Sequence, residues 1–362
     1  MTALVDDPTA SATGPAPPEP GRRGRRRGLL ARDGARAAGL VAAGAVLVVL
    51  VGCSLAFGSK PIPLRTVVAA LAHFDGSDDQ VIVRSLRAPR TLLGVGVGAA
   101  LGLAGAVMQG VTRNPLADPG LLGVEAGAAL AVVLGIHGAG VATPTGYVWL
   151  ACAGAALAAL AVYGLGSLGA GGAAPVKLAL AGAALTALLT ALTSAVLLSD
   201  VQTFDQYRFW VVGSLAGRDM GVVRLVAPFL AGGALLALAG ARSLDVLALG
   251  DDVARSLGMR ISLARAVAAA AVVVLTGAAV AACGPIGFVG LTVPHMARAV
   301  TGPDHRWLLV WSAVLGPILL LAADIVGRVA ARPAELQVGI VTALVGAPFF
   351  VALVRRRRLA EL

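Results

Sequence analysis

The sequence is poor in charged residues, which make up only 13% of its 362 positions. A soluble domain normally carries about 25% charged residues, because its surface must be hydrated. The hydrophobic share here is 58%, so much of the surface must face something other than water. The scarcity of charge therefore argues against an ordinary soluble protein and predicts an integral membrane protein.

Aromatic residues and cysteines are also scarce. Aromatics make up 4% of the chain, and much of the net charge of +10 lies near its two ends, so we exclude a nucleic-acid-binding surface, in which basic and aromatic residues alternate. The three cysteines, Cys53, Cys152 and Cys283, stand in or beside three different apolar stretches, without CxxC or His/Cys spacing. We expect them to pack between helices and to bind no metal.

The chain lacks the motifs of common enzyme sites. It contains no GxxxxGK(S/T), no HExxH and no credibly placed Ser/His/Asp set, which argues against a P-loop and against hydrolytic chemistry. Few acids lie within the apolar stretches, and Glu125 and Asp324 are the main candidates. A secondary transporter usually needs buried ionisable groups to couple an ion to its substrate. Their scarcity points to an energy source outside this chain.

What the sequence does contain is a series of apolar segments, each long enough to cross a hydrocarbon core of ~30 Å. The predicted spans are 37–57, 90–110, 121–141, 147–168, 176–199, 220–241, 263–283, 287–301, 307–331 and 336–354. The eighth is short, so we expect it to cross only in part. The predicted fold is an all-α transmembrane bundle of about ten helices.

Basic residues next to the first and last spans indicate the orientation. Arginines crowd positions 22–36 and 355–358, and such residues are retained in the cytoplasm. Ten crossings place both termini on the same side, so we predict that both are cytoplasmic. The stretches 58–89, 200–219 and 332–335 are then external, and 242–262 is the longest cytoplasmic loop between spans. Arginines in or beside the external 58–89 stretch break this rule and call for a functional reason.

The predicted domain organisation is simple. Residues 1–36 are rich in Pro, Gly, Ala and Arg and predict a disordered basic cytoplasmic tail. Residues 37–356 form the membrane domain, and 357–362 a second cytoplasmic tail. Leu50–Cys53 also resembles a lipoprotein cleavage site. The apolar run continues through Phe57, and an even number of crossings requires this span. We therefore favour an uncleaved first helix.

The second span has a small residue at every fourth position: Gly94, Gly98, Gly102, Ala106 and Gly110. On a helix these residues form one stripe without side-chain bulk, which lets a neighbouring backbone approach closely. The stripe predicts tight packing, with the lining of a pathway as the alternative.

Three segments interrupt the helical pattern with Gly and Pro. Gln109–Gly123 predicts a tight helix–helix turn, and Gly284–Arg298 predicts a broken or re-entrant helix. In the second, His295 either handles protons or orders the turn beside Arg298, and we favour the turn. Leu249–Arg260 predicts a short amphipathic cytoplasmic helix, capped by Asp251 or Asp252 and ended by Gly258, with its apolar residues on one face.

These segments belong to a set of motifs in a specific order and spacing. They are Arg87-Ala-Pro-Arg90, Gln109 with Asn114-Pro-Leu-Ala-Asp-Pro-Gly-Leu-Leu-Gly123, Phe209-Trp-Val-Val-Gly213, Leu249-Gly-Asp-Asp-Val-Ala-Arg-Ser-Leu-Gly258, Gly284-Pro-Ile-Gly-Phe-Val-Gly290 with Pro294-His295, and Gly346-Ala-Pro-Phe349. From about residue 60 to 356 the chain resembles the FecCD/BtuC-type permeases of bacterial ATP-binding-cassette (ABC) importers, which carry iron-siderophores, haem and cobalamin.

The resemblance implies partners and a location. The chain would form a homodimer, or a heterodimer with a related permease, in the bacterial plasma (inner) membrane, with one path along the dimer axis. A cytoplasmic ATPase dimer, which binds ATP and Mg²⁺, would drive transport. An extracellular or periplasmic siderophore-binding protein would deliver the substrate. The chain itself would be no enzyme and would carry no cofactor or metal.

The resemblance also assigns roles to residues. The ATPase-coupling segment would contain Leu249, Gly250, Asp251, Asp252, Ala254, Arg255, Leu257 and Gly258. Arg87, Arg90 and Arg328 would meet acidic residues of the binding protein; hydration at the headgroup boundary is the alternative. The gate and pathway would involve Gln109, Asn114, Pro115, Phe209, Trp210, Gly284, Pro285, Gly287, Pro294 and His295.

The predicted function is inward transport of a ferric siderophore by an ABC importer permease. Haem or cobalamin as the substrate is the first alternative, because no side-chain set in the sequence separates these chelates. A secondary transporter or channel without an ATPase is the second, and a membrane scaffold that transports nothing is the third.

Overall fold

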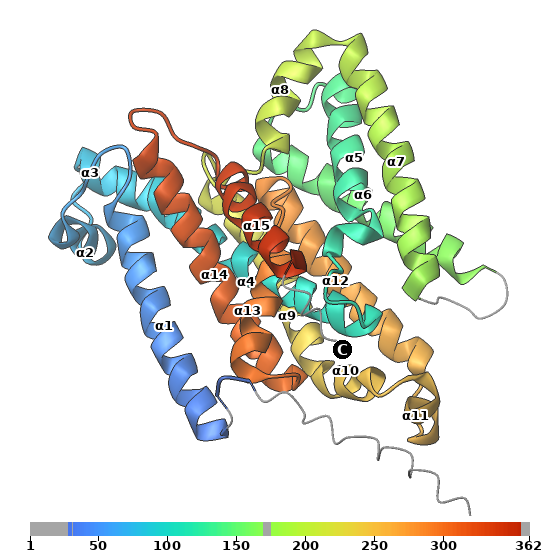
Figure 1. The fold of residues 1–362 in the computed structure, drawn as a ribbon. Coiled ribbons are helices and arrows are strands. Elements are labelled where there is room, and N and C mark those ends of the chain that lie inside the picture. The colour runs from blue at the N-terminus through green and yellow to red at the C-terminus, as the bar shows by residue number, and fades with distance from the viewer. Residues whose placement is uncertain (1–27, 31, 169–174, 356–362) are drawn as a thin grey trace, which may run out of the picture.

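The computed structural model describes residues 28–30, 32–168 and 175–355. This part of the chain is all-helical and contains no strand (Figure 1). Most of the predicted N-terminal tail and the whole of the predicted 357–362 tail lie outside the described residues. The first helix begins at Asp33, four residues before the predicted start of the first span.

Ten helices correspond to the ten predicted spans. They are α1 (Asp33–Ala56), α4 (Ala88–Thr112), α5 (Val124–Ala139), α6 (Pro144–Ser167), α7 (Pro175–Ser199), α9 (Met220–Ala239), α12 (Ile261–Cys283), α13 (Val289–Thr301), α14 (His305–Ala330) and α15 (Val338–Arg355). Within the described ranges, seven helices are long and apolar enough to cross a membrane, and α5 and α15 are shorter apolar helices. The predicted short eighth span is α13, with 13 residues.

Shorter elements connect these helices. They are α2 (Leu64–Ala72), α3 (Asp78–Val81), the π-helical turn η1 (Ile82–Arg87), the 3-10 turn η2 (Pro119–Leu122), α8 (Val201–Val211), α10 (Ala241–Ala248) and α11 (Asp251–Ser256). Helices α2, α3 and α8 share one end, here named the α8 end, and α10 and α11 share the opposite one, the α11 end (Figure 1). Helix α3, η1 and α4 form one continuous helical stretch over residues 78–112.

Helix α4 occupies the centre of the bundle and is the most buried of the membrane-capable helices. Its small-residue stripe packs against α14. A Cβ added to Gly98 would lie 2.7 Å from backbone atoms of Pro317, and one added to Gly102 would lie 2.5 Å from the carbonyl of Ser312. Only small residues permit this approach, so the stripe serves packing, as predicted.

The predicted helix break after α12 is present. Residues 284–288 are not helical, and Phe288 has a positive φ of 67°. Helix α13 runs through Pro294, as the predicted span 287–301 does. The missing N–H of Pro294 removes one backbone hydrogen bond. The burial of Val293 and Ala297 on the same short helix outweighs that loss.

Candidate functional site

The three arginines predicted to meet a binding protein gather at the α8 end of the bundle. Arg90 Nη2 lies 2.8 Å from Asp324 Oδ1, and Arg90 Nη1 lies 2.7 Å from Glu335 Oε2. Arg328 Nη2 lies 3.0 Å from Asp324 Oδ2. The arginine cluster, defined as Arg87, Arg90 and Arg328 with these two carboxylates, therefore connects α4, α14 and the loop before α15.

Two members of the cluster also hold the C-terminal end of α1. The guanidinium groups of Arg87 and Arg328 donate to the carbonyls of Ser54, Leu55, Ala56 and Phe57, at 2.7–3.0 Å. The last carbonyls of a helix have no partner within the helix, and positive charge is favourable beside them. Arg87 and Arg328 thus satisfy the end of α1 and fix it to the core.

This arrangement corrects one expectation from the sequence. Arg87, Arg90 and Arg328 are only 6%, 9% and 2% exposed, so they are neither free external side chains nor hydrated headgroup contacts. Each already has partners within the chain. Their role in docking a binding protein stays a prediction. Arg84, by contrast, is exposed, and its guanidinium lies 4.7 Å from the ring centre of Phe74.

Close backbone contacts join three segments at the α8 end. Ser214 N donates to Cys283 O at 2.7 Å, and Gly339 N donates to Gly213 O at 3.1 Å. A Cβ added to Gly284 would lie 2.1 Å from the carbonyl of Trp210, so only glycine fits there. We call residues 210–214, 283–285 and 338–339 the backbone junction.

The junction unites some of the predicted gate residues and separates others. Trp210 is 3% exposed and lies against Gly284, with Pro285 beside them. Phe209, by contrast, is 61% exposed. Gly287 is exposed in the non-helical stretch that follows. The junction is therefore the place where Trp210, one of the predicted gate residues, meets the break between α12 and α13.

Helix α8 is fixed at its start by Asp200. The carboxylate accepts hydrogen bonds from the backbone N–H groups of Gln202 and Thr203, and His137 Nδ1 of α5 lies 3.2 Å from Oδ2. Hydrogen bonds from the side chain of Thr203 and from His137 lower the pKa of Asp200 to about 2. This side chain therefore carries a negative charge at neutral pH and ties α8 to α5.

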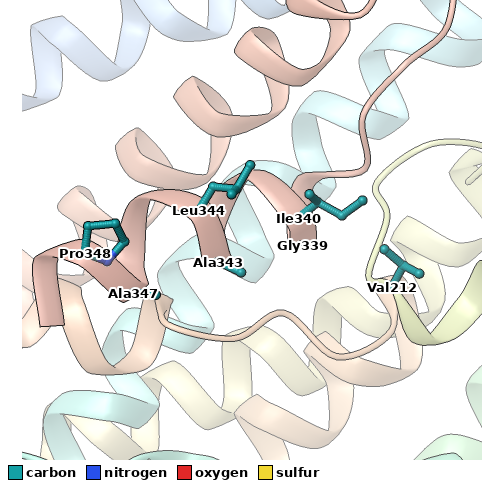
Figure 2. Close-up of a pocket in the computed structure, with 7 residues that line it drawn as sticks. All are labelled: Val212, Gly339, Ile340, Ala343, Leu344, Ala347 and Pro348. Atoms are coloured by element: carbon teal, nitrogen blue, oxygen red, sulfur yellow. The ribbon is translucent and has the colours of Figure 1, made fainter. Parts of the chain in front are cut away.

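An apolar groove of about 580 Å³ begins beside the junction. Figure 2 shows that one side of it is the face of α15. Its lining residues are Val212, Gly339, Ile340, Ala343, Leu344, Ala347 and Pro348. The groove presents no charged side chain, so it suits an apolar neighbour better than a hydrated ion.

The remaining predicted pathway residues lie toward the α11 end. Gln109 is fully buried, and its side chain bonds the carbonyl of Leu291 at 3.4 Å and Arg298 Nη1 at 3.3 Å. His295 Nδ1 donates to the carbonyl of Leu291 at 3.0 Å, within its own helix. This geometry agrees with a structural role for His295. The predicted gate set is thus divided between two ends of the bundle and does not form one site.

The turn after α4 contains two further predicted pathway residues, Asn114 and Pro115. Asn114 is exposed, and its side-chain oxygen accepts a hydrogen bond from the N–H of Leu116 at 2.9 Å. Such a bond shapes a turn locally. The segment is therefore a capped helix–helix turn, in agreement with the simplest interpretation of its sequence.

The predicted coupling helix is present as α11, although its details differ from the prediction. Neither Asp251 nor Asp252 caps it; the residue before the helix is Gly250, with a φ of 106° that disfavours other residues. Gly258 ends the segment with a φ of 78°, as predicted. The apolar residues do not share one environment as expected, because Ala254 is buried whereas Val253 and Leu257 are 44% and 63% exposed.

Acidic residues fix α10 and α11 to the bundle. Asp251 pairs with Arg113 after α4 and with Arg265 in α12. Asp245 Oδ1 accepts hydrogen bonds from both N and Nδ1 of His305, at 3.0 and 2.8 Å. Partial burial opposes ionisation of Asp245, but the bonds from His305 outweigh it and lower its pKa below the ordinary value. These pairs could not be predicted, since their partners are separated along the chain.

A shallow hollow of about 560 Å³ lies beside this network. Its wall includes Leu249, Asp251, Val253 and the two arginines that bind Asp251. Across the described ranges, no three His, Cys, Asp or Glu side chains come close enough together to hold a metal ion. What the described structure offers is a set of contact surfaces at the two ends of a packed bundle.

Comparison with known proteins assigns the fold to a family. The model of the FecCD transport family matches residues 46–356. The chain belongs to this family. It is similar to the ferric enterobactin transport system permease protein FepD of Escherichia coli, with 46% identity over 86% of this chain and 93% of FepD. The Probable siderophore transport system permease protein YfiZ of Bacillus subtilis is 41% identical, with the same two coverages.

Solved structures agree with this assignment. An inward-facing ABC transporter assigned to the metal-chelate type matches 88% of this FecCD-family chain and 99% of its own, with a TM-score of 0.78 and 28% identity. Further curated relatives are named for hemin and for cobalamin transport. The chain is thus a multi-pass ABC transporter permease of the inner membrane.

Proposed function

We propose that this chain is the membrane-spanning subunit of an ABC importer that moves a ferric siderophore inward. The observation that carries the proposal is the family match over nearly the whole helical region, together with relatives named for siderophores at 41–46% identity. The subunit performs no covalent chemistry. ATP and Mg²⁺ bind to a separate ATPase, and rigid-body shifts of helices open and close the path.

The α11 end is the cytoplasmic, ATPase-facing end in this proposal. Leu249, Val253 and Leu257 are 44–63% exposed there, on a short segment that projects from the bundle (Figure 1). Exposed apolar side chains beside the charged residues Asp252 and Arg255 suit a protein groove better than a lipid surface. Both chain termini then lie in the cytoplasm.

The α8 end is the external end and receives the binding protein. Arg90 is the arginine best placed for this contact, because its partner Glu335 is 33% exposed. A carboxylate of the binding protein takes the place of Glu335, while Asp324 keeps Arg90 in position. Complementary charge of this kind steers encounter and fixes the register of docking.

The transport path runs between two copies of the chain, or between this chain and a related permease. The groove along α15, which Val212 lines, and the exposed Phe209 supply apolar surface for a large chelate. The backbone junction forms the outer gate. Gln109, His295 and Arg298 order the opposite end, where the α4–α5 turn approaches the cytoplasm.

The first alternative is the same mechanism with haem or cobalamin, which the names of two further relatives support. A secondary transporter is disfavoured by one specific observation: the buried Asp324 is paired with two arginines. A carboxylate fixed in this way is poorly suited to take up and release a coupling ion.

The substrate is tested by uptake into vesicles that contain the chain, its ATPase and its binding protein. Labelled ferric siderophore, haem and cobalamin are supplied in parallel, each at the same concentration. We expect accumulation of the ferric siderophore well above the other two. Preferential accumulation of haem or cobalamin would assign the alternative substrate and retain the mechanism.

A further inference from the structure

The carboxylate of Asp251, at the start of α11, lies between two guanidinium groups. Arg265 Nη2 is 3.0 Å from both carboxylate oxygens, and Arg113 Nη2 also donates to Oδ1. Arg113 is 138 residues from Asp251 along the chain, and Arg265 is 14 residues from it. The side chain of Asp251 is only 29% exposed, so most of its surface is covered by other residues of the chain.

The two arginines belong to the ends of two central helices. Arg113 directly follows α4, in a left-handed conformation with a φ of 51°, and Arg265 lies in the second turn of α12. Helices α4 and α12 are the two most buried of the membrane-capable helices. One carboxylate therefore connects the projecting α11 segment with both helices.

Other residues of this segment are exposed. The side chain of Asp252 is 99% exposed and pairs with Arg255 of the same helix. Leu249, Val253 and Leu257 are exposed as well. These four exposed residues are here called the outward side, which a partner can reach; Leu249, Asp252 and Val253 also line the shallow hollow beside Asp251.

A second acidic residue holds the preceding helix. Asp245 of α10 bonds the backbone and side chain of His305 at the start of α14. Within residues 241–258, the carboxylate of Asp245 therefore binds α14, and the carboxylate of Asp251 binds the ends of α4 and α12. These two carboxylates thus contact three helices, beside the buried apolar side chains of Leu244, Leu247 and Ala254.

The charge balance makes Asp251 hard to replace. One carboxylate faces two guanidinium groups, and Arg265 Nε is buried without a hydrogen-bond partner in the part of the chain that the structure describes. An uncharged side chain at 251 leaves two like charges side by side, which repel one another. The attachment of α11 to both helices then weakens, while its exposed apolar residues stay in place.

We propose that Asp251 is a positioning residue, which passes the movement of a partner bound to the outward side of α11 on to α4 and α12. The inference rests on the proposed function in one respect, namely that the partner is the ATPase. Asp251 does not contact that ATPase in this account; it acts through Arg113 and Arg265. Asp252, its neighbour in sequence, has no such role.

The attachment is tested on the full chain in lipid nanodiscs, without any partner. Asp251→Asn is compared with the matched control Asp252→Asn by hydrogen exchange of the backbone amides of residues 251–257. We expect exchange about tenfold faster in Asp251→Asn, because weak attachment permits local opening. The control should match the unaltered chain. Equal exchange in both variants would overturn the inference.

The transfer of movement is tested with the ATPase and the binding protein present. Asp251→Asn should lower uptake per ATP hydrolysed about tenfold, with unchanged affinity for the ATPase. Asp251→Glu should restore most of the ratio. Affinity and uptake that fall in proportion would show that Asp251 contacts the ATPase instead. If the unaltered chain shows no ATP-driven uptake, the proposed function fails, and the exchange experiment still decides whether Asp251 attaches α11.

Discussion

Arg90 and Asp324 form a buried ion pair between α4 and α14, with Nη2 and Oδ1 2.8 Å apart although 234 residues separate them. Asp324 is 1% exposed and also binds Arg328 at 3.0 Å. One carboxylate thus compensates two buried cations. Removing it leaves more uncompensated charge than removing any other member of the arginine cluster.

Asp324→Asn should therefore destabilise the protein strongly. Breaking a buried ion pair by removing one partner costs about 3–5 kcal/mol of unfolding free energy. Thermal unfolding of the chain in lipid nanodiscs is the measurement that checks this loss. The control is Glu335→Gln, whose carboxylate is 33% exposed and whose loss should cost less than ~1 kcal/mol. Similar losses in the two variants would contradict the role given to Asp324.

Charge changes around Arg90 should alter capture of the binding protein. Reversal at Arg87 and Arg90 should weaken capture, most visibly at low ionic strength, where charges are least screened. Because reversal also disturbs the end of α1, Glu335→Gln supplies the cleaner test. It frees Arg90 Nη1 for a partner, so affinity should rise about threefold. An affinity unaffected by either change at low and high salt would remove the docking assignment.

The close crossing of α4 and α14 predicts a selective effect of glycine replacement. Gly98→Ala places a Cβ 2.7 Å from the backbone of Pro317, so the helices must move apart at a cost of about 1–3 kcal/mol. Gly44→Ala in α1 is the matched control, because a Cβ there meets nothing within 4 Å. Equal melting temperatures for both variants would mean that the stripe does not set the helix separation.

The outward side of α11 predicts a docking defect. Leu257→Asp replaces a side chain that is 63% exposed with a charged one, so burial against the ATPase becomes unfavourable. Binding of the ATPase should fall at least tenfold, measured with the purified chain in nanodiscs. Ser256→Asp adds the same charge at an exposed neighbour and should change binding little. Normal coupled transport in Leu257→Asp would rule out docking through that residue.

The number and order of the spans could be predicted from sequence, because the signal is local. Each span contains its own apolar run, and the glycines of the second span repeat at a helical interval. The helix break at 284–288 was likewise marked by Gly284 and Pro285.

The state of the charged residues could not be predicted in the same way. Arg87 and Arg90 were assigned to the outside because the stretch 58–89 lies between the first two predicted spans, yet their partners come from α1, α14 and the loop before α15. Asp251 and Asp252 are adjacent and chemically identical. Only the tertiary structure shows that one binds two arginines and the other lies 99% exposed.

The central claim, ATP-driven import, is tested most directly by leaving out one component at a time in reconstituted vesicles. Labelled ferric siderophore is supplied on the binding-protein side, and accumulation is measured with and without ATP, the ATPase and the binding protein. The account predicts accumulation only when all three accompany the chain. Accumulation by the chain alone under an ion gradient would contradict it and identify a secondary transporter.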